Sequence, residues 1–249
     1  MRQPIIYPLH DNDGYKPYED VVSDQIKKNI NDMNFKSNPN YCQVLEHVDQ
    51  GFGYQYLEKI QQEFPESLDE SLDKLKDFIN MNDKYGQPNK CEIDKYYCSP
   101  TSLRYFYQAL LILKHISESN VDTSINIVEI GGGYGGLCLA LHFLNPNIES
   151  YTICDLLPVM KLQEIYLNAF NISLSTEIKP NSFIVSCYGL SELDKYTRDK
   201  YIDALHDNIQ HGFIVWNVPG CDIEHVLKRK CTIVPEKPLT RDGNVFVYF

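Results

Sequence analysis

The chain has 249 residues, with 34 acidic and 23 basic side chains that give a formal net charge of −11. Its 43% hydrophobic and 23% charged residues are typical of globular proteins, and they exclude a disordered chain, a collagen-like repeat and a disulfide miniprotein. The acidic excess argues against nucleic acid as a partner, because binding to a phosphate backbone needs clustered lysine and arginine.

The cysteines and the start of the chain bear on the cellular compartment. The eight cysteines include no C-x-x-C pair and no Cys/His cluster with zinc spacing, and several lie in apolar runs. Residues 1–10 lack a basic segment followed by an apolar one, and no run of about 18 apolar residues occurs. We therefore expect free thiols, no signal peptide, no membrane partner and a cytoplasmic location, which is the host cytoplasm if the source is viral.

The first half, residues 1–121, is polar, rich in tyrosine and helical in pattern. Apolar spacing and helix breakers predict helices at residues 18–35, 54–64, 67–80 and 99–119. Ser99 can cap the last of these helices, and Pro100 fits its first position. We interpret this half as a helical cap that packs on the rest of the chain and contributes to substrate binding.

The second half, residues 122–249, alternates short apolar runs with amphipathic segments. The runs predict seven strands, at residues 125–130, 151–154, 172–178, 183–187, 213–216, 231–234 and 245–249. Helices are expected at residues 137–144, 157–170, 191–209 and 223–227. This alternation predicts right-handed crossovers and a mainly parallel α/β sheet that is covered on both faces. No helix separates the last two strands, so we expect them to form an antiparallel hairpin at the edge of the sheet.

The strongest local signal is the glycine-rich segment at residues 131–136, called the glycine loop below. It follows a predicted strand and opens a predicted helix, which is the context that a nucleotide-binding loop requires. Glycine lets the backbone turn sharply and lets a ligand approach it, and the helix start offers free N–H groups. Asp155 ends the next strand, where a carboxylate can accept hydrogen bonds from ribose hydroxyls.

Two ligands fit the spacing of these glycines. Gly131, Gly133 and Gly136 match the G-x-G-x-x-G fingerprint of dinucleotide sites. Counted from Glu129, with Gly135 as the third glycine, the segment also matches E-x-G-x-G-x-G, the pattern of S-adenosylmethionine loops. The second pattern is favoured because Glu129 can anchor the loop or the methionine ammonium, the loop starts near mid-chain, and the chain ends in an apparent hairpin. A dinucleotide site and a purely structural glycine turn remain the alternatives.

Longer segments resemble a known family. The chain is similar to the sugar O-methyltransferases of the class I methyltransferases at residues 35–41, 45–48, 99–105, 129–136, 151–156, 162–167 and 186–193. One departure is Leu157, which stands where the family commonly has proline, and Pro158 follows one position later. The resemblance implies a seven-stranded Rossmann-like sheet, mostly parallel with an antiparallel C-terminal hairpin strand, below an N-terminal helical cap.

The resemblance also implies a reaction. A methyl group would pass from S-adenosylmethionine to a hydroxyl of a nucleotide sugar or glycan, which leaves S-adenosylhomocysteine and an O-methylated sugar. A second hypothesis keeps the enzyme class but makes the acceptor a small natural product or a protein side chain. A third is a non-catalytic scaffold with the same fold. The oligomeric state stays open, and a homo-oligomer is one option.

The expected donor site comprises the glycine loop, the acid after the next strand and several flanking residues. We assign to it Glu129, Gly131, Gly132, Gly133, Tyr134, Gly135, Asp155, Leu156, Ser186, Tyr188 and Arg104. Arg104 could bind the carboxylate of the donor or a substrate phosphate. Glu192, just past the fourth predicted strand, is the first candidate for the general base that activates the sugar hydroxyl, and His47 is the second.

No metal site is assigned from the sequence. Magnesium is an open variant, because some sugar methyltransferases use it to bind the sugar diol, and it would need two or three converging carboxylates. The carboxylates at or near predicted strand ends are Asp155, Glu192, Asp222 and Glu224.

Overall fold

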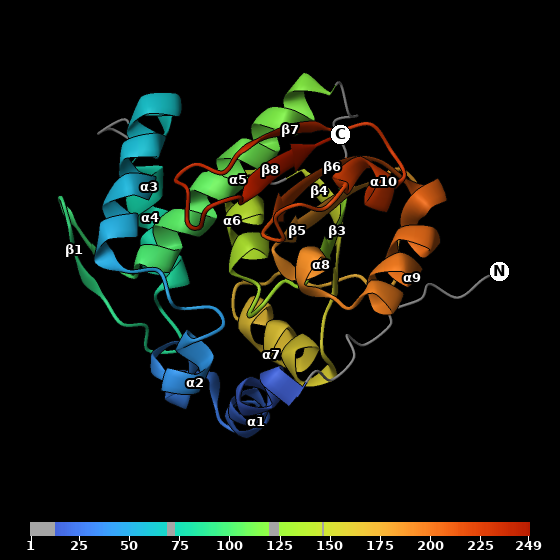
Figure 1. The fold of residues 1–249 in the computed structure, drawn as a ribbon. Coiled ribbons are helices and arrows are strands. Elements are labelled where there is room, and N and C mark those ends of the chain that lie inside the picture. Colours follow the sequence, from blue (N-terminus) through green and yellow to red (C-terminus); the bar gives the residue numbers. More distant parts are fainter. Residues whose placement is uncertain (1–12, 69–72, 120–124, 146) are drawn as a thin grey trace.

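A computed structural model describes residues 13–68, 73–119, 125–145 and 147–249 of the chain (Figure 1). The expected boundary between the two halves, at residues 121 and 122, lies outside the described residues, as do residues 1–10. An α/β sheet lies at the centre of the described part, with helices on both of its faces and the N-terminal helices along one side (Figure 1).

The central sheet has six strands in the order β4-β3-β5-β6-β8-β7. Its strands are β3 (Ile125–Ile130), β4 (Ile148–Cys154), β5 (Ser182–Cys187), β6 (Ile209–Trp216), β7 (Thr232–Pro235) and β8 (Val245–Tyr248). The first four are parallel to their neighbours among themselves, whereas β8 runs antiparallel to both β6 and β7. The predicted mainly parallel sheet and its C-terminal antiparallel hairpin are therefore confirmed.

The prediction of a seventh strand at residues 172–178 is wrong. This segment lies beside β4 but is fixed by isolated contacts, because the amide of Ser175 donates to the carbonyl of Tyr151 over 2.8 Å. The hydroxyls of Thr152 and Ser175 both donate to the carbonyl of Glu177, over 2.9 Å each. Side-chain bonds of this kind compete with a backbone ladder, so the sheet ends at β4.

The helix predicted at residues 191–209 is in fact two helices, α8 (Gly189–Glu192) and α9 (Lys195–Leu205). Asp194 separates them, since its carboxylate accepts a hydrogen bond from the amide of Thr197 and so caps α9. The chain then enters β6 four residues earlier than predicted.

Helices on the two faces of the sheet bury two separate hydrophobic clusters. α6 (Gly136–Leu144) and α7 (Leu157–Asn168) contribute to one cluster, whereas α9 and α10 (Ile223–Leu227) contribute to the other. Alternate residues of β3 serve the two clusters, because Ile127 belongs to the first and Val128 to the second. Both faces of the sheet are thus covered, as the alternation of strands and helices predicts.

The N-terminal region is the predicted helical cap, with one hairpin that was not predicted. Its helices and strands are α1 (Lys16–Gln25), α2 (Pro39–Cys42), α3 (Gln50–Glu63), α4 (Lys74–Asn82), β1 (Cys91–Ile93), β2 (Tyr96–Cys98) and α5 (Pro100–Glu118). Short 3-10 helices are η1 (Asp13–Tyr15), η2 (Ile30–Asp32), η3 (Phe35–Ser37), η4 (Pro65–Leu68) and, after α9, η5 (His206–Asn208). Ser99 caps α5 as predicted, because its hydroxyl accepts a hydrogen bond from the amide of Thr101. α5 packs on both α3 and α6, so the cap and one face of the sheet share a single core.

The first predicted helix, at residues 18–35, ends ten residues early, at Gln25. The side chain of Gln25 accepts a hydrogen bond from the amide of Asn34 and donates one to its side-chain oxygen, both over 2.9 Å. These bonds reverse the direction of the chain after α1, so that η3 packs against α1 with Phe35 and Lys36 buried.

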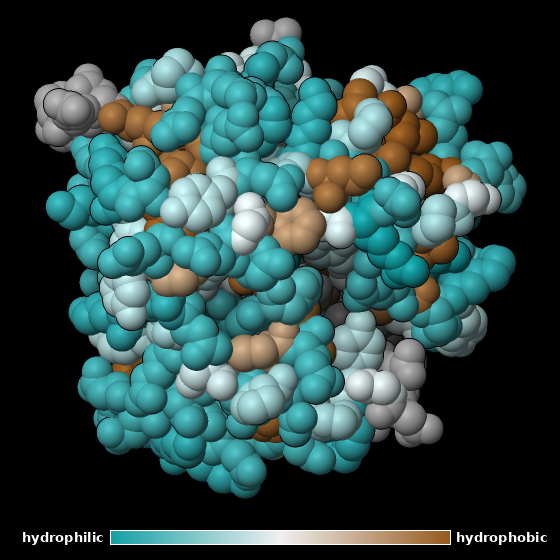
Figure 2. Space-filling model, turned by 60° about the vertical axis from the view of Figure 1, so that its left-hand side comes forward, coloured by the Kyte–Doolittle hydropathy of each residue, from teal (hydrophilic) through white to brown (hydrophobic). Residues whose placement is uncertain are grey.

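The hydropathy of the surface and the burial of the cysteines are those of a globular protein. The face shown in Figure 2 is mainly hydrophilic, with apolar residues gathered in a few patches. All eight cysteines are free thiols, and Cys98, Cys138 and Cys154 are buried. None of the helices in the described part of the chain has the length and apolar character needed to span a membrane.

Candidate active site

A pocket of about 810 Å³ opens at the carboxyl ends of the parallel strands. The chain passes from β3 to β4 on one side and then crosses to β5 on the other side of β3. Open α/β sheets bind their ligands at such a reversal of strand order, in the crevice outside the strand ends. The segments that follow β3, β4, β5 and β6 form the strand-end wall of the pocket, at residues 131–133, 155–156, 187–189 and Asn217.

The helical cap forms the opposite side of the pocket. This cap wall comes from the segment before α3, from α3 itself and from α5, and it includes Leu45, His47, Phe52, Tyr56, Arg104 and Gln108. The volume lies towards the upper end of the roughly 300–1,000 Å³ that is usual for ligand pockets. It therefore offers space for two reactants side by side.

The glycine loop has the backbone conformation that its composition predicts. Gly131, Gly133 and Gly135 all have positive φ angles, of 75°, 56° and 94°. A Cβ atom on Gly131 would lie 3.0 Å from the Cα atom of Gly189, which belongs to the neighbouring strand end. Positive φ and a close backbone neighbour together require glycine at this position. The loop thus presents bare backbone to the pocket.

Asp155 ties the end of β4 to the glycine loop. Its Oδ2 atom accepts hydrogen bonds from the amide of Gly133 over 3.1 Å and from the side chain of Gln163 over 3.0 Å. Its Oδ1 atom accepts from the amide of Leu156 over 2.8 Å. Burial raises the pKa of Asp155 to about 7, although these hydrogen bonds oppose the shift. The carboxylate is 5% exposed and lines the pocket, where a hydroxyl-bearing ligand would meet it.

Glu129 is a second buried carboxylate in the pocket lining. Its side chain is 2% exposed, and its Oε2 atom accepts a hydrogen bond from the hydroxyl of Tyr151 over 2.8 Å. Burial raises the pKa of Glu129 to about 8, and the nearby charge of Asp155 acts in the same direction. No lysine, arginine or histidine within the described ranges forms an ion pair with it. A cationic ligand would therefore find an acceptor here that the protein itself leaves uncompensated.

Arg104 and Gln108 face the pocket from one side of α5, one helical turn apart. The guanidinium of Arg104 is held by the carbonyl of Leu45, to which Nη2 donates over 2.9 Å. The Oε1 atom of Gln108 is buried and receives no hydrogen bond from any described residue. A buried acceptor without a donor is costly, so a ligand that donates there would gain. Gln108 was missed in the sequence, although its spacing of four residues from Arg104 is a signal that could have indicated it.

The two candidate bases approach the pocket from opposite walls. Glu192, in α8, accepts hydrogen bonds from the hydroxyl of Tyr15 over 2.7 Å and from the side chain of Asn217 over 2.6 Å. His47 lies between α2 and α3 on the cap wall. Desolvation, reinforced by the positive charge of Arg104, lowers the pKa of His47 to about 4, so its ring is neutral at pH 7. Either side chain can accept a proton.

The structure places three of the assigned donor residues outside the pocket lining. The ring of Tyr134 points into the core below the loop, where its hydroxyl bonds to Asn82, and Gly135 lies against α7. The hydroxyl of Ser186 donates to the carbonyl of Ile130 and accepts from the amide of Leu190, over 2.8 Å each. These residues support the loops that border the pocket, whereas the other assigned residues line it or, in the case of Tyr188, close it.

Tyr188 and the loop between β7 and β8 form the rim. Tyr188 has a φ angle of 73°, which is a strained backbone for a residue other than glycine, and its hydroxyl donates to the buried carboxylate of Glu236. The other oxygen of Glu236 accepts hydrogen bonds from Thr240 and Asn244, both of which line the pocket together with Arg241. Glu236 thus fixes a rim loop that the sequence did not indicate as part of the site.

The carboxylates considered for magnesium do not converge. Asp155 and Glu192 line the pocket, whereas Asp222 caps α10 and Glu224 pairs with Lys230. Across residues 13–68, 73–119, 125–145 and 147–249, no group of three or more His, Cys, Asp and Glu side chains is placed to hold a metal ion.

No family model matches the sequence, and no curated protein matches it. The fold is similar to that of a candidate O-methyltransferase from Nostoc punctiforme PCC 73102, with a TM-score of 0.45 and 12% identity over 60% of this chain and 58% of that one. It is also similar to TrmK of M. capricolum in complex with S-adenosyl-homocysteine, with a TM-score of 0.38 and 16% identity over 58% of this chain and 66% of that one. For the mitomycin 7-O-methyltransferase MmcR, the TM-score is 0.38 and the identity 10%, over 94% of this chain and 67% of that one. The chain therefore spans less than two thirds of the length of the first two.

Proposed function

We propose that this protein is an S-adenosylmethionine-dependent O-methyltransferase whose acceptor is a sugar hydroxyl. The observation that carries the proposal is the pocket at the reversal of strand order. It combines a bare glycine backbone, a carboxylate at the next strand end and, on the cap wall, a buried cation beside an unsatisfied acceptor. This set matches a ligand that has a ribose at one end and an amino-acid zwitterion at the other.

The residues present fit this donor in chemical kind. Asp155 would accept hydrogen bonds from the ribose hydroxyls, and the backbone at residues 131–133 would contact the nucleoside. Arg104 would bind the methionine carboxylate, while Glu129 and the Oε1 atom of Gln108 would accept from its ammonium. A bound ammonium would donate a hydrogen bond to the Oε1 atom of Gln108, which has no donor among the described residues.

The dinucleotide alternative fits the same walls less well. Its diphosphate would lie over the glycine loop, beside the buried carboxylate of Glu129. With its pKa raised to about 8, Glu129 stays protonated beside a diphosphate and forms no ion pair with it, whereas a bound cation favours its ionised form. A sulfonium and an ammonium, by contrast, both carry a positive charge that the ionised form of Glu129 would bind.

In this mechanism the main role of the protein is to position the methyl donor and the acceptor hydroxyl. When bound, S-adenosylmethionine would supply an activated methyl group for transfer to the acceptor oxygen, with S-adenosylhomocysteine as the leaving group. Alignment of this kind contributes up to roughly 7–11 kcal/mol in well-oriented systems. Glu192 takes the hydroxyl proton in our proposal, because it lies at the pocket edge next to the strand ends, with Tyr15 and Asn217 fixing its carboxylate. Such a base adds about 10²–10⁴-fold to the rate.

The acceptor would bind against the cap wall. Phe52 and Tyr56 supply apolar and aromatic surface there, and His47 and Arg241 supply polar groups near the rim. The sugar itself is inferred from the family resemblance of the sequence. We also place the reaction in the reducing cytoplasm, since all eight cysteines are free. A panel of nucleotide sugars, glycans, phenolic natural products and peptides, each with labelled donor, tests the acceptor class.

A thermal-shift measurement with S-adenosylhomocysteine, and in parallel with NAD, tests the donor. A ligand at 100 times its dissociation constant stabilises a protein by about 2.7 kcal/mol. We expect a shift of about 5–10 °C with S-adenosylhomocysteine and none with NAD. A shift with NAD alone would indicate a dehydrogenase, and no shift with either ligand would indicate a scaffold.

A further inference from the structure

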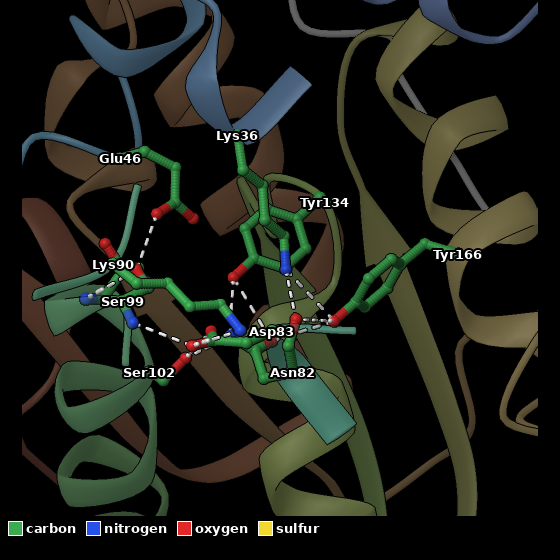
Figure 3. A network of polar contacts seen from close by, with 10 residues as sticks. Lys36, Glu46, Asn82, Asp83, Lys90, Ser99, Ser102, Tyr134 and Tyr166 are labelled. Atoms are coloured by element: carbon green, nitrogen blue, oxygen red, sulfur yellow. Dashed lines mark hydrogen bonds and ion pairs between the residues drawn. The ribbon is translucent and has the colours of Figure 1, made fainter. Parts of the chain in front are cut away.

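A lysine ammonium is buried between the cap and the glycine loop, in the network that Figure 3 shows. Lys36, in η3, is 0% exposed, and its Nζ atom donates to the carbonyl of Asn82 over 2.5 Å and to the hydroxyl of Tyr166 over 3.4 Å. Nζ lies 4.0 Å from the centre of the Tyr134 ring and 4.8 Å from that of Tyr166. No carboxylate of a described residue forms an ion pair with it.

This placement is expensive for a charged group. Burial lowers the pKa of Lys36 to about 8, although the charges of Glu46 and Asp83 oppose the shift, so the group remains mostly protonated at pH 7. The ammonium is compensated by three aromatic rings and by the carboxyl end of α4, whose last residue is Asn82. A methionine of similar length would fill the space without the desolvation cost. The charge therefore adds contacts with the surrounding rings and with the carbonyl of Asn82 that an apolar side chain would not make.

Of the three rings around the ammonium, that of Tyr134 lies nearest. It is the one residue with a side chain in the glycine loop, and both of its neighbours, Gly133 and Gly135, have positive φ angles. Its ring packs edge-on against Tyr166, with 5.0 Å between ring centres, and its hydroxyl receives a hydrogen bond from the side chain of Asn82 over 3.0 Å. Asp155 and Gln163 hold the backbone of Gly133, whereas Tyr134 is the only side chain that the loop itself sends into the core. Every described partner of that side chain except Tyr166 comes from the cap.

We propose that Lys36 is a positioning residue that holds the Tyr134 ring and, through it, the backbone of residues 131–133 in the conformation that faces the pocket. The cap then forms part of the donor site, in addition to any contact with the acceptor. The identity of the ligand rests on the proposed function, whereas the ordering of the loop does not.

Hydrogen–deuterium exchange without ligand tests the ordering directly. The amides of Gly131, Gly133 and Gly135 are hydrogen-bonded to Cys154, Asp155 and Gly132, so their exchange reports on the loop. In Lys36→Met we expect exchange at residues 131–136 to be about tenfold faster, since a desolvated cation–π contact is worth that order of affinity. The matched control is Lys76→Met, an exposed lysine on α4, which should leave exchange unchanged. Unchanged exchange in a folded Lys36→Met protein would overturn the proposal.

The same variants are titrated with S-adenosylhomocysteine by calorimetry. Lys36→Met should raise the dissociation constant about tenfold and Lys76→Met should not. In a Tyr134→Leu background the effect of Lys36→Met should disappear, because the ring through which Lys36 acts is gone. Effects that simply add would assign Lys36 a general structural role and would overturn the proposal. If the wild-type protein fails to bind while Lys36→Met still loosens the loop, the proposed function falls and the positioning role stands.

A second pair of variants covers the case in which Lys36→Met does not fold. Tyr134→Phe keeps the ring under the ammonium and removes only the hydroxyl, whereas Tyr134→Leu removes the ring. We expect Tyr134→Phe to keep most of the protection at residues 131–136 and Tyr134→Leu to lose it. Equal protection in the two variants would contradict a role for the ammonium–ring contact.

Discussion

The two walls of the pocket are built in different ways. The strand-end wall acts through backbone and short side chains that are fixed by the sheet, such as Gly131 with its φ angle of 75° and Asp155 with three hydrogen-bond donors around it. The cap wall acts through side chains of helices and loops, such as Arg104, whose guanidinium is held by the carbonyl of Leu45, and Gln108, whose buried oxygen is unsatisfied. The strand-end wall is thus preformed by the sheet, whereas the cap wall keeps a buried acceptor that only a ligand would satisfy.

Removing the proposed base should have the largest effect on the reaction rate. Comparing variants of Glu192 and His47 tests which wall supplies that base. Glu192→Gln keeps the hydrogen bond to Tyr15 and removes the proton acceptor, so we expect the turnover number to fall by about 10²–10⁴-fold with the affinity for S-adenosylhomocysteine unchanged. His47→Gln is the matched variant on the cap wall, and it should cost less than tenfold. Initial rates with labelled donor measure both. A reversed order of effects would move the base to the cap wall.

Filling the glycine loop should break the strand-end wall. In Gly131→Val the new side chain meets the backbone of Gly189 at a positive φ angle, so we expect donor affinity to fall by about 100-fold. Gly220→Val is the matched control, because Gly220 also has a positive φ angle, of 76°, but has nothing within 4 Å. Calorimetric titration with S-adenosylhomocysteine compares them. Similar losses in both variants would mean that backbone strain, and not the pocket, is responsible.

Removing the unsatisfied oxygen of Gln108 tests whether the cap wall binds the amino-acid end of the donor. Gln108→Leu deletes the buried oxygen that we assign to the methionine ammonium, so donor affinity should fall by about tenfold while the free energy of unfolding of the apo protein stays equal or rises. Calorimetry and chemical unfolding measure the two quantities. Adenosine, which lacks the amino acid, is the matched ligand, and it should bind both proteins equally. A loss of adenosine affinity would show that Gln108 does not contact the amino-acid end.

The smallest expected effect is on stability, through the buried carboxylates. The folded-state pKa of Glu129 is raised to about 8 from an ordinary value of 4.5, so the folded protein holds a proton that the unfolded chain releases. The stability from this group is full below about pH 4.5 and is lost as the pH rises through 8. Glu129→Gln should therefore flatten the fall in apo melting temperature between pH 6 and pH 9 by several degrees, at about 2–4 °C per kcal/mol. A wild-type melting temperature that rises over this range would contradict the assignment.

Much of the sheet could be predicted because its strands carry strong local patterns. The strand at Ile125–Ile130 and the helix at Ile223–Leu227 lie at their predicted positions, and the C-terminal hairpin pairs as expected. The short hairpin at Cys91–Ile93 and Tyr96–Cys98 has only three residues in each strand, which gives no usable alternation. The segment at residues 172–178 has apolar residues at strand spacing, but it makes only isolated bonds to β4, from the amide of Ser175 to the carbonyl of Tyr151 and from the hydroxyl of Thr152 to the carbonyl of Glu177.

In the candidate site, too, the local features could be predicted and the tertiary contacts could not. The glycine loop and Asp155 follow from composition and strand order, since bare backbone and strand ends are local features. Tyr134 could not be placed, because a tyrosine between two glycines faces the ligand or the core depending on where Lys36 and Asn82 lie. The rim loop fixed by Glu236 likewise depends on contacts between distant segments. Sequence patterns report periodicity and spacing, and they carry little information about such tertiary contacts.

A crystal structure of the protein with S-adenosylhomocysteine would show directly how the pocket is used. We expect the ligand between the two walls, with its ribose hydroxyls on Asp155, its carboxylate at Arg104 and its ammonium facing Glu129 and Gln108. A ligand bound elsewhere, or bound in this pocket with its ribose at the cap wall and its amino acid at Asp155, would contradict it.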